Sequence, residues 1–174
     1  IEPVMGAGGM IPAEKEFLKG LAELCRERGT LLIFDEVITG FRLGPGGAQK
    51  KWGITPDLTV LGKIAGGGLP MGVIAGKREI MEHLDHTKYQ VPDYCFHGGT
   101  HTGNPMSTTA GLVTLKILEK GSAYGKIDAF GVDVVHLLKV VNRVERHTDT
   151  VHRGALVAAF VRADDEPVRE RTQI

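Results

Sequence analysis

Two side chains of complementary chemistry, Asp35 and Lys63, each come at the end of a short apolar run. A lysine that leaves an apolar strand for a glycine-rich turn is partly desolvated, so its uncharged amine becomes available as a nucleophile. Such an amine can form a Schiff base with a carbonyl compound. A carboxylate at a neighbouring strand end could hold a protonated pyridine nitrogen. Taken singly, the lysine could also be an ordinary solvated side chain and the aspartate a helix cap.

Two buried strands are predicted to position this pair. Residues 31–34 form a short, continuous apolar run, which is typical of a strand buried on both faces of a parallel sheet. Residues 58–61 form a second run, and the glycines at 66–68 then allow a tight turn after Lys63. Because open α/β sheets place ligands at strand ends, we expect Asp35 and Lys63 at one sheet edge.

The remaining elements indicate an α/β architecture. Residues 12–28 have the apolar spacing of an amphipathic helix, with Pro12 at its start and Gly29 after its end. A strand, a helix and a strand in succession imply a right-handed crossover and a parallel sheet. Further elements are predicted as a strand at 71–75 and helices at 48–52, 79–84, 106–120 and 132–144.

The segments FDEVITGFR and TPDLTVLGKIAGGGLPMG resemble the signature of class III pyridoxal-phosphate-dependent aminotransferases of fold type I. The resemblance runs from about residue 2 to residue 119, and within the family it is strongest to the glutamate-1-semialdehyde aminomutases. It implies an incomplete fold-type-I large domain, a mostly parallel sheet flanked by helices, in residues 1–120. Residues 121–174 would then be the start of a small α+β domain or a divergent tail.

The resemblance also implies the roles of five residues. Lys63 would hold pyridoxal phosphate as a Schiff base and act as the catalytic base, Asp35 would pair with the pyridine nitrogen, and Val37 would pack on the cofactor ring. In the segment GGTHTGNP, Gly99 and Thr100 would reach the cofactor phosphate of the neighbouring subunit in a homodimer. The residues themselves are compatible with a phosphate site, because glycine N–H groups, threonine hydroxyls and a helix start attract anions, but by composition alone such a loop is an ordinary turn in most proteins.

Three functions remain open at this stage. An aminomutase would convert glutamate semialdehyde to 5-aminolevulinate for tetrapyrrole synthesis. A class III ω-aminotransferase would use the same core residues between an amine and a 2-oxo acid, and His101-Thr102 departs from the pattern typical of aminomutases. A non-catalytic chain that retains the fold is the third, because the family's N-terminal phosphate loop and C-terminal substrate pocket are absent from these residues.

Composition excludes several other classes. The 21 basic and 21 acidic residues balance, which argues against nucleic acid or an anionic membrane as a partner. No apolar run has the length of a bilayer span. Cys25 and Cys95 make neither a disulfide framework nor a CxxC pair, and this cysteine usage favours a reducing, cytoplasmic setting. The histidines lack convergent partners, so no metal site is assigned.

The run before Asp35 and Glu36 also fits a magnesium-binding strand of an ATPase, but Gly62-Lys63 is followed by isoleucine rather than Ser or Thr. The chain begins at Ile1 without a leader, from which we expect an internal or truncated piece. Residues 143–174 are rich in charge, and the resemblance fades after Tyr124.

Overall fold

The computed structural model describes residues 1–144, with side chains as far as residue 133, and the predictions for the charged tail lie outside these residues. The chain falls into two compact units, Ile1–Tyr124 and Gly125–Ile174. In the second unit the described residues belong to α5 (Ser122–Val144), which begins at the end of the first unit. The division into domains of 1–120 and 121–174 remains a prediction.

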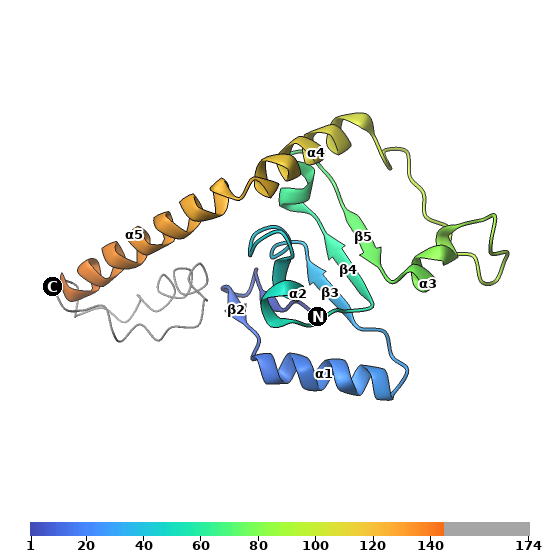
Figure 1. The fold of residues 1–174 in the computed structure, drawn as a ribbon, viewed down its shortest axis with the longest axis horizontal. Coiled ribbons are helices and arrows are strands. Elements are labelled where there is room, and N and C mark those ends of the chain that lie inside the picture. The colour runs from blue at the N-terminus through green and yellow to red at the C-terminus, as the bar shows by residue number, and fades with distance from the viewer. Residues whose placement is uncertain (145–174) are drawn as a thin grey trace. The chain divides into compact units, whose positions relative to one another are not determined.

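A three-stranded sheet is the centre of the first unit (Figure 1). Its order is β3 (Ile33–Glu36), β4 (Leu58–Leu61) and β5 (Val73–Gly76). β3 and β4 are parallel, as predicted, whereas β5 runs antiparallel to β4. A hairpin of β1 (Val4–Met5) and β2 (Ile11–Pro12) precedes them.

The N-terminal residue extends the sheet beyond β3. The amino group of Ile1 donates to the carbonyl oxygen of Ile33 at 2.9 Å, and the N–H of Asp35 donates to the carbonyl oxygen of Ile1 at 2.8 Å. In a parallel ladder, one residue forms hydrogen bonds to residues i and i+2 of the neighbouring strand, and Ile1 follows this pattern. Ile1 therefore lies beside the strand that carries Asp35.

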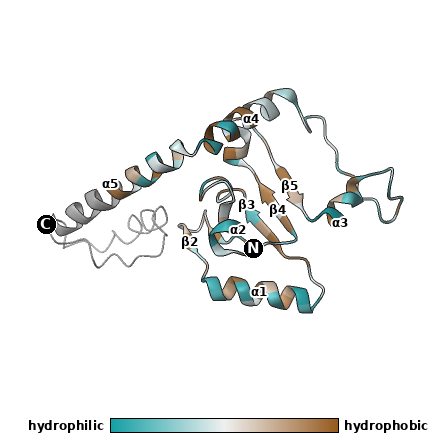
Figure 2. Cartoon of the chain, in the orientation of Figure 1, coloured by the Kyte–Doolittle hydropathy of each residue, from teal (hydrophilic) through white to brown (hydrophobic). Residues whose placement is uncertain are grey.

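The hydrophobic core lies between one face of this sheet and α1 (Lys15–Glu27). Leu18 of α1 is fully buried and packs with Leu32, Phe34 and Ile54. Figure 2 shows the amphipathic character of α1, on which hydrophilic and hydrophobic residues alternate along the helix. Burying a side chain such as Phe34 contributes about 1.5–3 kcal/mol, so this cluster fixes β3 against α1.

The strand around Asp35 differs from its prediction in two respects. β3 begins at Ile33 instead of residue 31, and it includes Asp35 and Glu36 instead of ending before them. Phe34 and Glu36 are buried while Ile33, which is 41% exposed, and Asp35 are exposed. The prediction of burial on both faces was therefore wrong, because the core covers only one face in the described part of the chain.

The helices follow the sequence pattern with two corrections, one of which is that α5 begins at Ser122, ten residues before the predicted start at residue 132. α2 (Gly47–Trp52) and α4 (Pro105–Glu119) lie within one residue of their predicted bounds. The predicted helix at 79–84 is present as α3 (Arg78–Met81) followed by the short 3₁₀ helix η2 (Glu82–Leu84). Pro12 was expected at a helix start, but it pairs with Val4 in the hairpin, and α1 begins three residues later.

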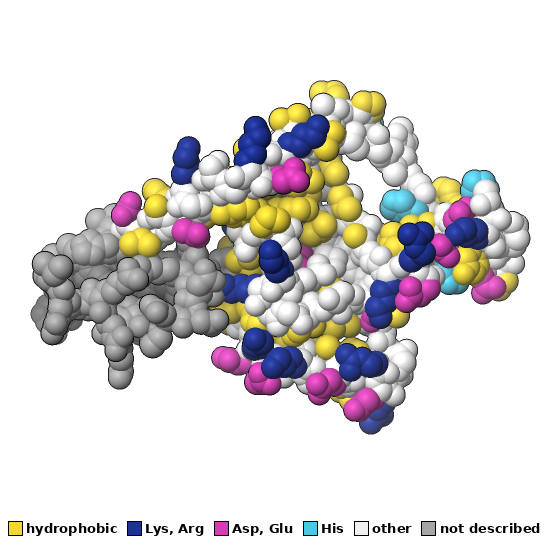
Figure 3. All heavy atoms as spheres, in the orientation of Figure 1, with side chains coloured by type: hydrophobic (Ala, Val, Ile, Leu, Met, Phe, Trp, Pro, Cys, Tyr) yellow, Lys and Arg dark blue, Asp and Glu magenta, His cyan; other side chains and the backbone are white. Residues whose placement is uncertain are grey.

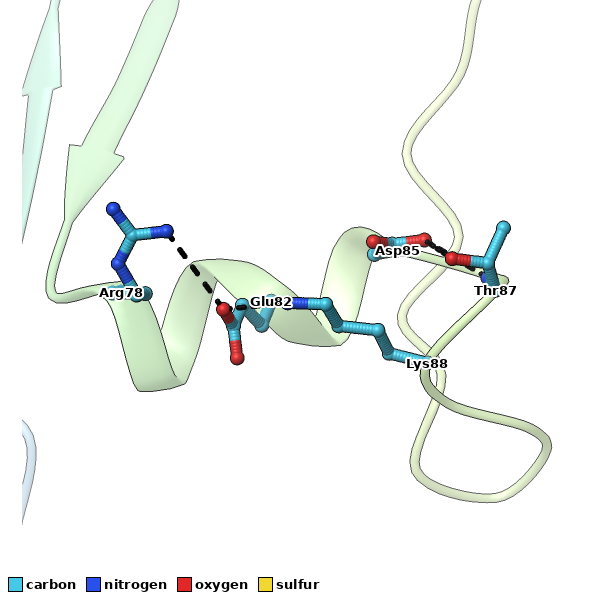
Figure 4. Close-up of polar contacts among 5 residues, drawn as sticks. All are labelled: Arg78, Glu82, Asp85, Thr87 and Lys88. Carbon is cyan, nitrogen blue, oxygen red and sulfur yellow. Dashed lines mark hydrogen bonds and ion pairs between the residues drawn. The ribbon is translucent and has the colours of Figure 1, made fainter.

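The segment after α3 is held by its own polar contacts (Figure 4). Glu82 accepts a hydrogen bond from Lys88 at 2.7 Å and lies 3.9 Å from Arg78, and Asp85 accepts two bonds from Thr87. His83 stacks on a tyrosine ring, and its Nδ1 lies 2.7 Å from a backbone carbonyl oxygen. Among the residues whose side chains are described, up to residue 133, no cluster of metal-ligating side chains occurs. None of the described helices combines the length and the hydropathy that crossing a bilayer requires.

Asp57 ties the other end of the sheet together. Its carboxylate accepts the N–H of Leu32 at 2.7 Å and forms an ion pair with Lys77 at 2.6 Å, so it joins the segments that flank β3, β4 and β5. The hydrogen bond from Lys77, followed by that from Leu32, lowers the pKa of Asp57. The same contact raises the pKa of Lys77. This contact lies at the sheet end opposite to the predicted site.

Candidate active site

The lysine loop begins where β4 ends. Gly62 leads from Leu61 into the 3₁₀ helix η1 (Lys63–Gly66), which is closed by a hydrogen bond from the N–H of Ala65 to the carbonyl oxygen of Gly62 at 3.0 Å. Lys63 has a φ of +45°, a left-handed conformation that costs a residue with a side chain about 1–3 kcal/mol. Such strain persists only where the surrounding structure holds it.

The backbone of α4 lies directly against this loop and supplies that support. A Cβ added at Gly111 would collide with the carbonyl oxygen of Ala65, and one at Gly67 would lie 2.5 Å from the carbonyl oxygen of Ala110. Gly67 has a φ of +60°, so the loop needs glycine there on two counts. Ser107, one turn before Gly111, is the other buried residue of α4. The lysine loop is therefore set by contact between two backbones.

Asp35 and Val37 lie at the same edge of the sheet as this loop. The ladder pairs Asp35 with Val60 and Glu36 with Leu61, so β3 and β4 end side by side. Oδ1 of Asp35 accepts the N–H of Val37 at 3.0 Å, and Oδ2 has no hydrogen-bond partner in the described part of the chain. A Cβ at Gly62 would lie 3.3 Å from Cγ1 of Val37, which places this side chain against the residue that precedes Lys63.

The exposure of Lys63 corrects one expectation. The sequence predicted that the amine would be partly desolvated, but Lys63 is exposed among the described residues. Lys63 follows the end of β4, and it does not belong to the hydrophobic core, which lies on the α1 side. The side chain of Lys63 is therefore accessible, and the described residues do not bury it.

Gly99 and Thr100 lie apart from the other three residues. Both are exposed in the loop before α4, and the carbonyl oxygen of Gly99 accepts the N–H of Thr102 at 3.0 Å. Gly99 lines a pocket of about 830 Å³ together with Leu69, Met71 and the start of α4. Lys63, Asp35 and Thr100 are absent from the described lining of this pocket. None of the described contacts joins Gly99 or Thr100 to Lys63, Asp35 or Val37.

Two residues with clear structural roles were not identified from the sequence. Asn104 caps α4, because its Oδ1 accepts the N–H of Ser107 at 2.9 Å; an asparagine before a proline and a helical pattern is a signal that could have found it. Glu36 is buried beside Asp35 and accepts several hydrogen bonds. The alternation Phe34-Asp35-Glu36 predicts its inward position once the strand is extended by two residues.

This edge can hold a planar cation and react with a carbonyl group. The exposed amine of Lys63, a carboxylate oxygen of Asp35 that has no partner among the described residues, and the branched apolar side chain of Val37 lie at the ends of two parallel strands. The carboxylate suits a protonated ring nitrogen, the apolar side chain suits a ring face, and the amine suits a carbon electrophile. The donor set thus fits a pyridine aldehyde.

Comparisons with known proteins agree with this chemistry. The family model for class-III aminotransferases matches residues 1–172. Glutamate-1-semialdehyde 2,1-aminomutase of Ignicoccus hospitalis is 48% identical over 155 residues, which are 89% of this chain and 35% of that protein. The aminomutase of Chlorobium phaeobacteroides is 52% identical over 128 residues, 74% of this chain and 28% of that protein. The chain thus spans about a third of the length of these relatives.

Solved structures of transaminases share the fold. An ω-transaminase from Sphaerobacter thermophilus has a TM-score of 0.71 and 40% identity, covering 78% of this chain and 30% of that one. A transaminase with PLP bound has a TM-score of 0.77 and 34% identity, covering 86% of this chain and 34% of that one. The predicted fold-type-I α/β class is therefore confirmed.

The contact between α4 and the lysine loop yields a prediction about two helical glycines. Gly111→Ala should lower the free energy of unfolding by about 1–3 kcal/mol, because the added methyl group displaces Ala65 and the loop that carries Lys63. Gly20→Ala in α1 is the matched control: a Cβ there meets nothing within 4 Å, so it should stabilise the chain by about 0.5–1 kcal/mol. Urea denaturation measures both, and equal stabilities of the two variants would contradict the packing described.

Proposed function

The chain belongs to the class-III aminotransferase family, and we propose that it carries part of the catalytic centre of a glutamate-1-semialdehyde 2,1-aminomutase. The observation that carries this proposal is the strand edge at which Asp35, Val37 and Lys63 meet. Curated aminomutases that are about 50% identical over most of this chain support the choice of reaction.

The proposed cofactor is pyridoxal 5'-phosphate, which when bound supplies an electron sink for proton removal beside an amino nitrogen. Lys63 would hold it through Nζ, and Oδ2 of Asp35 would accept the hydrogen bond of its protonated pyridine nitrogen. The branched side chain of Val37, which already lies against Gly62, would cover one face of the ring. Oδ2 of Asp35, which has no hydrogen-bond partner among the described residues, and the exposed side chain of Lys63 support this assignment.

Lys63 would also move the proton in the reaction. Its Nζ, once uncharged and released from the cofactor, would carry a proton between a carbon of the substrate and a carbon of the cofactor. The turn of η1 fixes the start of this side chain, while the exposed position leaves Nζ free to swing between the two carbons. Asp35 would keep the ring nitrogen protonated by accepting its hydrogen bond.

Gly99 and Thr100 would serve a second copy of the chain. Both are exposed and lie on a loop that is separate from Lys63, so we propose a homodimer in which they reach the phosphate of the neighbouring subunit's cofactor. The backbone N–H of Gly99 and the hydroxyl of Thr100 are donors that suit a phosphate. The free thiols of Cys25 and Cys95 agree with a reducing cytoplasmic setting, which we also propose.

A class III ω-aminotransferase is the second candidate, because the Sphaerobacter enzyme is 40% identical and uses the same fold. The two reactions differ in their substrates. The aminomutase needs glutamate semialdehyde alone, since both amino positions belong to one molecule, whereas the aminotransferase needs an amine and a 2-oxo acid.

Product analysis tests the proposed reaction. With pyridoxal phosphate and glutamate semialdehyde as the only substrate, the chain should form 5-aminolevulinate, and Lys63→Ala should be slower by about 10³-fold because the base is lost. Lys116→Ala, which removes an exposed lysine on α4, should leave the rate unchanged. If a product forms only after a 2-oxo acid and an amine are added, that result would contradict the proposed aminomutase reaction and support the aminotransferase reaction.

Mixing two inactive variants tests the proposed exchange between subunits. Lys63→Ala and Thr100→Ala dimers should each bind or use the cofactor poorly. In a hybrid dimer, one site would combine the intact Lys63 of one copy with the intact Thr100 of the other. Equal mixing should therefore restore pyridoxal phosphate binding above either parent. A mixture that never exceeds its parents would show that Thr100 does not serve the neighbouring subunit.

A further inference from the structure

We propose that Glu36 is the positioning residue of this site: its buried carboxylate holds the end of β3 so that Asp35 and Val37 face the lysine loop. The residue is only 1% exposed. A buried carboxylate is costly unless it is hydrogen-bonded, and its presence next to a candidate site residue therefore calls for an explanation.

Four donors satisfy the Glu36 carboxylate. Oε2 accepts the hydroxyl of Thr39 at 3.0 Å and the N–H of Ala48 at 2.6 Å. Oε1 accepts the N–H of Gln49 at 3.3 Å and its side-chain amide at 3.1 Å. Hydrogen bonds to an ionised acceptor are roughly twice as strong as neutral ones. The carboxylate therefore fastens both the turn after β3 and the start of α2 to β3.

The same network extends to the strand that leads to Lys63. The side-chain amide of Gln49 also donates to the hydroxyl of Thr59 at 3.0 Å, and Thr59 is a buried residue of β4. Thr59 pairs with Phe34 in the parallel ladder. Glu36 thus links β3 to β4 through side chains, in addition to the backbone ladder.

Glycines make room for this arrangement. A Cβ at Gly47, whose φ is +57°, would collide with Oε2 of Glu36. A Cβ at Gly40 would lie 2.7 Å from the carbonyl oxygen of Glu36, and the N–H of Gly40 donates to that oxygen at 2.8 Å. The chain therefore closes tightly around Glu36 from both sides of the turn.

The inward direction of Glu36 sets the outward direction of its neighbours. Successive side chains of a strand point to opposite faces, so a fixed Glu36 requires Asp35 to project from the exposed face. Asp35 then accepts the N–H of Val37, and Val37 contacts Gly62. This inference rests on the proposed function, because the direction of Asp35 and Val37 matters for catalysis only if they hold the cofactor.

Glu36→Gln in the full chain tests the proposal, with Asp57→Asn as the matched control. In Glu36→Gln an amide NH₂ faces buried donors, whereas Asp57→Asn disturbs hydrogen bonds at the opposite end of the same sheet. Titration with pyridoxal phosphate should give a Kd at least tenfold higher for Glu36→Gln and within twofold of the parent for Asp57→Asn. Equal weakening in both variants would reduce Glu36 to a general stabilising residue and overturn the proposal.

A double mutant separates positioning from a direct role. If Glu36 acts through Asp35, Glu36→Gln should raise the Kd less than twofold further in a chain that already carries Asp35→Asn. Full additivity would overturn the proposal. Gln49→Met is a milder variant in case Glu36→Gln fails to fold, because it removes only the side-chain amide that links Glu36 to Thr59. Gln49→Met should raise the Kd for pyridoxal phosphate about threefold. An unchanged Kd would contradict the proposed network.

A measurement without the cofactor keeps this test independent of the proposed function. A nuclear Overhauser contact between the Val37 methyl groups and Gly62 should be present in the parent and in Asp57→Asn and should be lost in Glu36→Gln. If the parent fails to bind pyridoxal phosphate, the proposed function fails while this contact still decides the role of Glu36. Retention of the contact in Glu36→Gln would overturn the positioning role.

Discussion

The parallel register of β3 and β4 is the constraint on which the candidate site depends. It places Glu36 opposite Leu61, so the two strands end together and the residues around their ends share one edge. The Glu36 network on the buried side and the Asp57 contact at the far end both act across these strands. A slip of one residue would turn Asp35 into the core and would turn both Phe34 and Glu36 out of it.

Close contact between backbones is the second feature that shapes the site. α4 approaches the lysine loop at Gly111, where no side chain intervenes, and this packing holds Lys63 at a positive φ. The apolar residues of α4 are largely exposed instead: Leu112, Val113 and Ile117 are each more than half exposed, and Figure 3 shows hydrophobic side chains at the surface along this helix. The small residues of α4 serve the lysine loop, and its apolar residues lie elsewhere on the surface.

Much of this arrangement could be predicted from the sequence, because periodicity and turn residues act locally. The bounds of β4, α2 and α4 follow from such signals, and Asp35 and Lys63 were placed at one edge by the rule for parallel strands. Glu36 was missed because an acidic pair after an apolar run resembles a strand end. Its burial is stabilised by hydrogen bonds from other segments, which a local pattern does not reveal. The exposure of Lys63 and the antiparallel β5 likewise depend on packing that no local pattern encodes.

The most direct test of the account is to find which lysine captures pyridoxal phosphate. The chain would be incubated with the cofactor, reduced with borohydride so that any Schiff base becomes a stable amine, and digested for peptide mass mapping. We expect the added mass on Lys63, and we expect Asp35→Asn to lower the labelled fraction while Lys116→Ala leaves it unchanged. Label spread over exposed lysines, or equal labelling of the chain and of Asp35→Asn, would contradict a cofactor site at the ends of β3 and β4.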